Sequence, residues 1–281
     1  MYESYLSIFL NSSLAVDNVA GPLTLFFLFL ARMLPIIALS PFFGSRILPH
    51  PVKVTFAISL FAVFLPLLLT VTTTKLDFDH LSLVLFAKEI FVGFIIGTFA
   101  SIPFIIVQSA GIVIDHQRGG ASLMVNDPTV QNQSSPLGTL FNFVLIYVFF
   151  LIDGPFVILD AIMKSYELVP PDGFINPAFF AKNSPFWQSA IQLLARTTRI
   201  FTQLAAPSLI IILMTDVFLG IANRLAPQVQ ITFLGMPLKS LLALTVIALG
   251  WKAYVDQTVI ESNNWLSHIN EIILMFKPAV Q

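Results

Sequence analysis

The chain has 281 residues, of which 57% are hydrophobic and only 10% are charged, and 28 are phenylalanine. Soluble domains are about 45–50% apolar and about 25% charged, so this composition excludes an ordinary soluble protein and indicates a membrane protein. A net charge of −1 with no basic block gives no footprint for nucleic acid, and the absence of cysteine with four scattered histidines predicts no metal site and no cofactor.

Apolar runs long enough to cross a bilayer as helices recur along the chain. Residues 1–20 carry Glu3 and Asp17 but no lysine or arginine, so we expect no removable signal peptide there. We expect six membrane segments, at residues 22–43, 54–74, 90–110, 137–152, 200–222 and 240–255. The pattern predicts an all-α, multi-pass membrane protein. Because no repeat or linker divides the sequence, residues 1–281 are expected to form a single membrane-embedded unit.

Prolines interrupt these segments in a systematic way. They are Pro35 and Pro41 in the first, Pro66 in the second, Pro103 in the third, Pro155 closing the fourth and Pro207 in the fifth. Proline removes a backbone donor, so we expect bent helices packed as hairpins, although tolerated kinks would give the same pattern. Gly93 and Gly97 have the spacing that lets two helix backbones approach closely.

The distribution of lysine and arginine gives only a slight bias between the two membrane faces. By the positive-inside rule it places both termini in the cytoplasm. So slight a bias also fits segments that pack against other proteins rather than lipid. Between 160 and 199 lies the longest polar connection, where residues 170–173 predict a turn and the following stretch suits a helix at the membrane interface.

Six charged residues fall within or beside the apolar segments: Arg32, Glu89, Asp153, Asp160, Arg199 and Asp216. We expect most of them at the membrane surface, where long side chains reach water. Arg32 and Asp216 lie deeper, so a buried partner and a surface position stay equally open for each. An ion-coupled transporter of a small solute would use carboxylates such as Asp216 and Asp153. No histidine lies in an apolar segment and no nucleophile turn is present, so we expect no enzyme.

The stretch 109–138 is an unusual polar connection between two hydrophobic segments. It places Asp115, Gln117 and Arg118 against two glycines, Gly119 and Gly120, before an Asp-Pro turn. A loop of this length between hydrophobic helices is often functional, although a plain connector is the alternative.

The stretch 222–240 reads as the tip of a helical hairpin. Arg224 suits the C-terminal end of a helix, and Pro227 prevents simple continuation. Pro237, with Gly235 before it, is expected to shape the start of the next segment. Amides at 228 and 230 supply donors and acceptors where several subunits could converge, although a polar surface turn is the alternative.

Several motifs resemble the FliR/SctT family, membrane components of the type III secretion export gate. They are "IDHQRGGAS", the following "DP", "SPLG", "KSYELVP" and "NRLAPQVQITFLGMPLK", in the family's order and at similar spacing. The first is closer to the virulence (injectisome) branch than to the flagellar one. The chain departs from the family pattern at His116, Gly120 and Gln230, and no glycine follows Pro128 closely.

The resemblance implies a non-enzymatic, all-α subunit in the bacterial inner membrane. Such proteins join SctR- and SctS-type subunits around the entrance of the secretion channel, through which unfolded secreted proteins pass. Their hydrophobic segments pack mainly on one another as bent hairpins.

The resemblance also implies two functional regions. The pore-closing loop comprises Gly111, Asp115, Gln117, Arg118, Gly119, Gly120, Met124, Asp127 and Pro128. The cytoplasmic mouth, near the SctU-type switch subunit, comprises Arg224, Pro227, Gln228, Gln230, Gly235, Pro237 and Lys239. This placement of Arg224 and Lys239 differs from the face that the charge count assigns to them.

Overall fold

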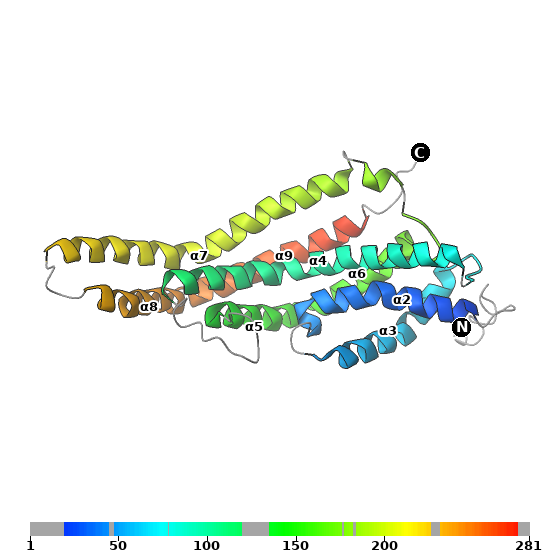
Figure 1. The fold of residues 1–281 in the computed structure, drawn as a ribbon, viewed down its shortest axis with the longest axis horizontal. Helices are drawn as coiled ribbons and strands as arrows, with labels where there is room; N and C mark the ends of the chain where they lie inside the picture. Colours follow the sequence, from blue (N-terminus) through cyan, green and yellow to red (C-terminus); the bar gives the residue numbers. More distant parts are fainter. Residues whose placement is uncertain are drawn as a thin grey trace. The chain divides into compact units, whose positions relative to one another are not determined.

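The described part of the computed structural model is helical and contains no strand (Figure 1). It covers residues 20–44, 48–77, 79–119, 135–175, 177–181, 184–225 and 231–274. The helices are α2 (Ala20–Leu39), α3 (His50–Val71), α4 (His80–Gln117), α5 (Pro136–Leu151), α6 (Gly154–Leu168), α7 (Pro185–Leu225), α8 (Ile231–Leu249) and α9 (Trp251–Leu274). Two short 3-10 helices, η1 (Pro41–Phe43) and η3 (Pro177–Phe180), complete the order. The all-α prediction is confirmed.

By length and apolar composition, four of these helices can each cross a membrane: α2, α3, α4 and α7. Two further spans are available if each pair of helices joined at a short bend counts as one, namely α5 with α6 and α8 with α9. The prediction of up to six broken or bent membrane segments is therefore confirmed. Pro35, Pro66, Pro103 and Pro207 lie inside helices, where each removes one backbone donor.

Three boundaries differ from the predicted ones. The expected segment 240–255 is interrupted at Gly250, between α8 and α9, because glycine weakens a helix interior. Pro155 begins α6 rather than ending the fourth segment, since the first turn of a helix needs no donor at that position. The connection 160–199 contains most of α6 and the first turns of α7, whose polar residues conceal the helical continuity from a hydropathy reading.

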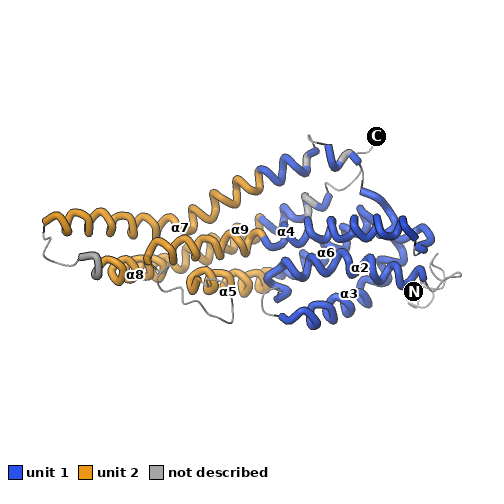
Figure 2. Tube along the Cα trace, in the orientation of Figure 1, with its two compact units in different colours: residues 1–101, 153–191, 265–281 blue, residues 102–152, 192–264 orange. Residues whose placement is uncertain are grey.

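The chain forms two compact units, each built from separate stretches (Figure 2). Unit 1 comprises residues 1–101, 153–191 and 265–281, and unit 2 comprises residues 102–152 and 192–264. Because neither unit is one continuous stretch, no single cut of the sequence separates them. A single export-gate subunit over 1–281 stays a prediction.

Unit 1 packs α2, α3, α6 and the first part of α4. Phe29 of α2 lies 5.7 Å from the ring of Phe64 in α3 and stacks on Tyr166 of α6 at 5.9 Å. Gly93 of α4 faces the backbone of α2, where an added Cβ would stand 2.9 Å from the carbonyl carbon of Arg32. A Cβ at Gly97 would stand 3.0 Å from Ile36. The predicted close approach of two helices at these glycines is confirmed.

Unit 2 packs the end of α4, α5 and most of α7, α8 and α9. Gly111 of α4 lies against Gly138 of α5, where an added Cβ would stand 2.5 Å from the opposite Cα. Phe141 of α5 contacts Tyr254 of α9 with ring centroids 4.3 Å apart. α7 and α8 lie side by side, because a Cβ added at Gly235 would meet Leu219 at 3.3 Å. The predicted helical hairpin around 222–240 agrees with this pairing.

Candidate functional site

The carboxylate of Asp115 is the centre of the first site, in unit 2. Asp115 lies in the last turns of α4, and its side chain is only 1% exposed. Its Oδ1 accepts hydrogen bonds from Arg118 Nε and Nη2, both at 2.7 Å, and its Oδ2 accepts from the backbone N–H of Leu137 at 2.9 Å. Ser135 Oγ also donates to Oδ2. Charge-assisted bonds of this kind are about twice as strong as neutral ones.

Ser135 connects this carboxylate to the start of α5. Its hydroxyl accepts a hydrogen bond from Gly138 N at 2.9 Å and so caps the helix, which a serine before Pro136 favours. The same hydroxyl gives its proton to Asp115. The end of α4 and the start of α5 are therefore held by one buried acidic side chain, with Gly111 and Gly138 allowing the backbones to meet.

Arg118 extends this site to α8. Its Nη1 donates to Ser240 Oγ at 2.9 Å, and its side chain is 11% exposed. Gly119 follows with a φ of +95°, a left-handed conformation that favours glycine, and lies against Met236. Gln117 is exposed beside them. Residues 120, 124, 127 and 128 of the predicted pore-closing loop lie outside the described residues.

The described residues of the predicted cytoplasmic mouth lie on α7 and α8. Arg224 is exposed in the last turn of α7, where a cation complements the helix dipole. Gly235 and Pro237 lie inside α8, so the expectation that they shape its start is wrong; the helix already begins at Ile231. Lys239 forms an ion pair with Asp216 of α7. Residues 227, 228 and 230 lie outside the described residues.

The structure brings parts of the two predicted regions together within unit 2. Arg118 and Gly119 come from the first region, and their neighbours Ser240 and Met236 flank members of the second. Sequence reasoning missed Ser240 and Ser135. The capping role of Ser135 could have been predicted, since a serine directly before proline at a helix start is a common cap. The role of Ser240 could not, because it depends on Arg118, which is 122 positions away.

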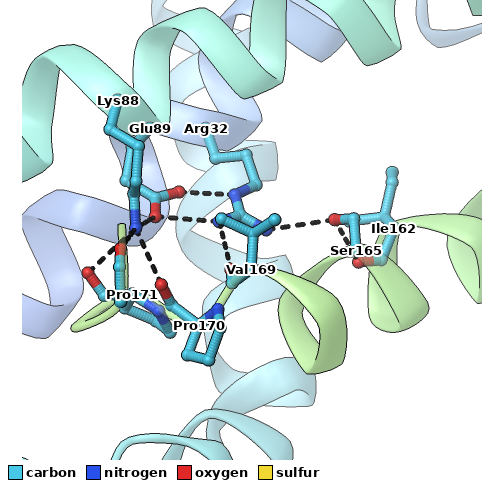
Figure 3. A network of polar contacts seen from close by, with 9 residues as sticks. Arg32, Lys88, Glu89, Ile162, Ser165, Val169, Pro170 and Pro171 are labelled. Atoms are coloured by element: carbon cyan, nitrogen blue, oxygen red, sulfur yellow. Dashed lines mark hydrogen bonds and ion pairs between the residues drawn. The ribbon is translucent and has the colours of Figure 1, made fainter. Parts of the chain in front are cut away.

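A second polar site is buried in unit 1 (Figure 3). Arg32 of α2 and Glu89 of α4 are both 0% exposed, and the Arg32 guanidinium donates to both carboxylate oxygens, with Nη2 at 2.8 Å from Oε1. Lys88 Nζ lies 2.7 Å from the same Oε1. Two cations thus share one carboxylate away from solvent, which requires further acceptors.

Backbone carbonyls after α6 supply those acceptors. Arg32 donates to Val169 O at 2.7 Å, and Lys88 donates to Pro170 O at 2.7 Å, Pro171 O at 3.1 Å and Gly173 O at 2.9 Å. Figure 3 shows Val169, Pro170 and Pro171 together on one side of the cluster. Prolines suit this segment, because they leave carbonyls free while adding no donors of their own.

Two side chains of α6 complete the site around Arg32. Ser165 Oγ accepts from Arg32 Nη1 at 3.1 Å, and the ring of Tyr166 lies 3.9 Å from the guanidinium carbon, within cation–π distance. Sequence reasoning missed Lys88, Ser165 and Tyr166 as partners. The stretch "KSYELVP" contains two of them, but nothing in the sequence shows that it faces Arg32.

The predictions for the six charged residues within or beside the apolar segments are partly confirmed and partly wrong. A buried partner for Arg32 is confirmed, whereas the surface position expected for Glu89 is wrong, because close packing at Gly93 brings α2 over it. Asp216 has a partner in Lys239 but is 44% exposed. The remaining three, Asp153, Asp160 and Arg199, are exposed as expected.

Asp172 attaches the connection that follows α6 to the end of α3 by hydrogen bonds. Its Oδ2 accepts from the backbone N–H groups of Thr73 and Thr74, each at 2.9 Å, and from both threonine hydroxyls. Partial burial acts to raise the pKa of this carboxyl, but the hydrogen bonds from Thr74 and Thr73 outweigh burial and lower the pKa below its usual 3.8.

These features define a multi-pass helical membrane protein with two buried ion-paired sites. The chain belongs to the family described as bacterial export proteins, family 1, which it matches over residues 23–263. The predicted FliR/SctT membership, and with it a place in the type III secretion export apparatus of bacteria, is confirmed.

Three relatives illustrate the range of the family. The secretion system apparatus protein SsaT of Salmonella typhimurium is 28% identical over 197 residues, covering 69% of this chain and 73% of SsaT. The surface presentation of antigens protein SpaR of Shigella sonnei is 31% identical over 221 residues, covering 77% and 80%. The flagellar biosynthetic protein FliR of Buchnera aphidicola is 24% identical over 260 residues, covering 87% and 94%.

Proposed function

We propose that the chain is a non-enzymatic subunit of the type III secretion export gate in the bacterial inner membrane. With SctR- and SctS-type subunits it forms and closes the entrance of the protein-conducting channel for unfolded secreted proteins. The observation that carries this proposal is the family match over residues 23–263, with relatives named for secretion and flagellar export.

The exposed face of α7 supports an assembled state. Large apolar side chains recur there at intervals of three or four residues and are exposed: Ile210, Leu213, Met214, Val217, Phe218, Ile221 and Leu225. Such a stripe needs lipid or the apolar face of another helix. Because Arg224 interrupts its end and Lys239 pairs with Asp216 beside it, a face shared with other subunits suits this helix better than lipid alone.

We assign the pore-closing function to the region around Asp115, Arg118 and Gly119, and subunit contacts at the cytoplasmic mouth, near the SctU-type subunit, to the region around Arg224 and Lys239. The contacts of Arg118 with Ser240 and of Gly119 with Met236 support a joint role, since residues assigned to closure and residues beside the mouth meet in unit 2.

A solute transporter is the competing function. Unit 2 contains a cavity of about 450 Å³, lined by residues such as Gln203, Pro207, Tyr254 and Gln257. None of the described residues that line it is acidic, whereas ion-coupled transport requires a titrating carboxylate near the solute. Among the described residues, the two carboxylates with essentially no exposure, Glu89 and Asp115, are both neutralised by cations. The export gate therefore fits better.

Co-purification after mild detergent extraction tests the proposal. A tagged chain expressed with the remaining secretion genes should elute in a large complex with small hydrophobic membrane subunits. The Asp216→Asn variant serves as the second arm, because a transporter that uses this carboxylate would lose solute uptake while remaining a monomer or dimer. A monodisperse monomer or dimer with saturable solute binding would refute the export-gate assignment.

A further inference from the structure

The cavity of about 450 Å³ in unit 2 lies where two helical runs are broken. Pro207 removes one backbone hydrogen bond from α7, and Gly250 separates α8 from α9 at a bend of 64°. Both residues line the cavity. Its volume is within the range of about 300–1,000 Å³ that is usual for sites of small ligands.

The lining of this cavity combines apolar side chains with uncharged polar ones. Large apolar side chains come from α4, α5, α7 and α8: Ile114, Phe141, Ile200, Leu204, Val246 and Ile247. The polar side chains are those of Gln203, Ser208, Tyr254 and Gln257. None of the described lining residues is charged, so the cavity suits a neutral apolar body that carries a hydrogen-bonding group.

Tyr254 has an unused hydrogen-bonding group at this site. Its ring packs on Phe141, with ring centroids 4.3 Å apart, but its hydroxyl is buried and has no hydrogen-bond partner among the described residues. Thr258, one turn further along α9, donates its own proton to the Tyr254 carbonyl at 2.8 Å. Burial of an unpaired hydroxyl is unfavourable, so a ligand that offers it an acceptor is favoured.

The cavity also lies where both helical runs change between polar and apolar. α7 carries exposed Arg199 one turn before Gln203 and exposed apolar side chains from Ile210 onward. α8 has no charged residue from 240 to 249, whereas α9 carries exposed Lys252 in its first turn. Such a change marks the surface of a bilayer, the depth at which the ester and phosphate groups of phospholipids lie.

We propose that the cavity binds one membrane phospholipid. An acyl chain lies among the apolar side chains, its ester carbonyl accepts a hydrogen bond from the Tyr254 hydroxyl, and the phosphate stays outside, toward Arg199. The inference goes beyond the export-gate assignment and does not depend on it, because it uses the residues of unit 2 alone. A lipid bound there stabilises the bent form of both helical runs, since it binds the folded chain only.

Matched lipids test the hydrogen bond to Tyr254. The full-length chain in detergent is titrated with dioleoyl phosphatidylglycerol and with its ether-linked analogue, which lacks the ester carbonyls, and binding is counted by native mass spectrometry. The ether lipid should bind roughly fivefold to tenfold more weakly, the effect of one hydrogen bond. In Tyr254→Phe the two lipids should bind equally. Equal binding of both lipids to the native chain would overturn the ester contact.

Filling the cavity tests its place. Ala253 lines the cavity, so Ala253→Phe should lower affinity for the ester lipid about tenfold or more. The matched control is Ala248→Phe, since Ala248 is exposed on α8 and is not among the lining residues. Equal affinities of the two variants, each with a native thermal midpoint, would overturn the site.

A photo-cross-link in the native chain keeps the site testable if Ala253→Phe does not fold. A phosphatidylglycerol with a diazirine in its acyl chain should label residues 200–208 and 246–257, mapped by mass spectrometry. Label confined to the exposed apolar face of α7 would show surface lipid only and overturn the proposal.

The headgroup position is tested with Arg199→Gln. This variant should bind phosphatidylglycerol severalfold more weakly at low salt and bind dioleoylglycerol, which has no phosphate, as the native chain does. An equal effect on both lipids would overturn the position of the phosphate.

The same cross-link in the assembled complex distinguishes a lipid from a protein occupant. Persistent labelling of residues 200–208 and 246–257 supports the lipid, whereas labelling that disappears on assembly means that another subunit fills the cavity and overturns the proposal. Failure of the proposed function has a separate signature, the absence of other membrane subunits on co-purification, while lipid binding is measured on the chain without them.

Discussion

The two buried ion-pair sites use the same chemistry for different structural purposes. In unit 1, Arg32 and Glu89 are completely buried, and the surplus cation Lys88 is satisfied by three backbone carbonyls. In unit 2, Asp115 is just as buried, but its partner Arg118 is 11% exposed and passes one donor to a hydroxyl on another helix. Both sites join several helices, but the first is shielded from solvent, whereas the second reaches solvent through its partly exposed arginine.

That difference indicates which of the two sites stabilises the fold and which of them can rearrange. A buried site whose charged groups all have charged or hydrogen-bonding partners strongly resists rearrangement, because breaking it leaves uncompensated charge in an apolar surrounding. A site whose cation is partly exposed can rearrange at lower cost, because water can replace the hydrogen bonds that the cation loses. We therefore expect substitutions in unit 1 to affect the amount of folded protein, and substitutions at Arg118 to affect the closed state.

Glu89→Gln should have the largest effect. It leaves Arg32 and Lys88 buried without a counter-charge, and breaking a buried pair in this way costs about 3–5 kcal/mol. We expect the variant to be degraded or to aggregate, measured as loss of membrane-bound protein by immunoblot and of a thermal transition in detergent.

The matched control for this variant is Glu167→Gln. Glu167 is an exposed carboxylate on α6, so the same change in charge should leave the amount of protein and its thermal transition unaltered. Equal abundance of the two variants would contradict the stabilising role of the Arg32–Glu89 pair.

Arg118→Ala should have the next largest effect, and a different one. Asp115 loses two charge-assisted bonds but keeps those from Ser135 Oγ and the Leu137 N–H, so the closed state should shift toward leakage while most protein still reaches the membrane. Conductance of membranes containing the complex measures this. Arg118→Lys should recover part of the closure, because lysine keeps the charge but not the fork of donors. Unchanged conductance in a fully assembled Arg118→Ala complex would leave the connection a passive link.

Asp172→Asn should have a smaller effect, confined to the attachment of the 169–173 connection to α3. The folded-state pKa of Asp172 is lowered, so its carboxylate stabilises the fold above the unfolded-state pKa, and this contribution is lost as pH falls through the lowered value. The midpoint temperature of the native chain should therefore decline below about pH 4, measured by a thermal scan in detergent, and the variant should lack that part of the decline. Identical pH curves would refute the role of the Thr73 and Thr74 bonds.

The sequence predicts most of the fold because hydropathy reports burial from water or lipid. It places α2, α3 and α5 almost where they lie, and the glycines at 93 and 97 predict a close helix contact without naming its partner. Hydropathy fails where a helix is polar, as in α6 and the start of α7, which carry charges and amides. It also misses the break at Gly250, which falls inside an apolar run.

The sites are predictable only in part, because the sequence shows which residues are polar or charged but not which residues they contact in the fold. The polar residues at 115, 117 and 118 are visible in the sequence as unusual, and Arg32 as deep in a span. Their partners are 122 and 57 positions away, at Ser240 and Glu89. Glu89 is an instructive error: adjacent to Lys88 it resembles a surface charge, yet α2 covers it.

Tyr166→Phe should have the smallest effect, and it tests how the unit 1 site is held together. The hydroxyl of Tyr166 is buried and has no hydrogen-bond partner among the described residues. Its ring, by contrast, packs on Phe29 at 5.9 Å and lies 3.9 Å from the Arg32 guanidinium carbon. Phenylalanine keeps both ring contacts and removes an unsatisfied polar atom, whose burial costs about 1–3 kcal/mol.

The thermal midpoint of Tyr166→Phe in detergent should therefore be equal to or above that of the native chain. Tyr166→Leu is the matched comparison, since leucine fills much of the volume but offers no π face to the cation, a contact worth about 2 kcal/mol when desolvated. A lower midpoint for the leucine variant alone would show that the ring, and not the hydroxyl, completes the Arg32 site. If the phenylalanine variant were strongly destabilised, the hydroxyl must bind a group such as an ordered water, and the Arg32 site would then be held by its hydroxyl as well as by charge and aromatic packing.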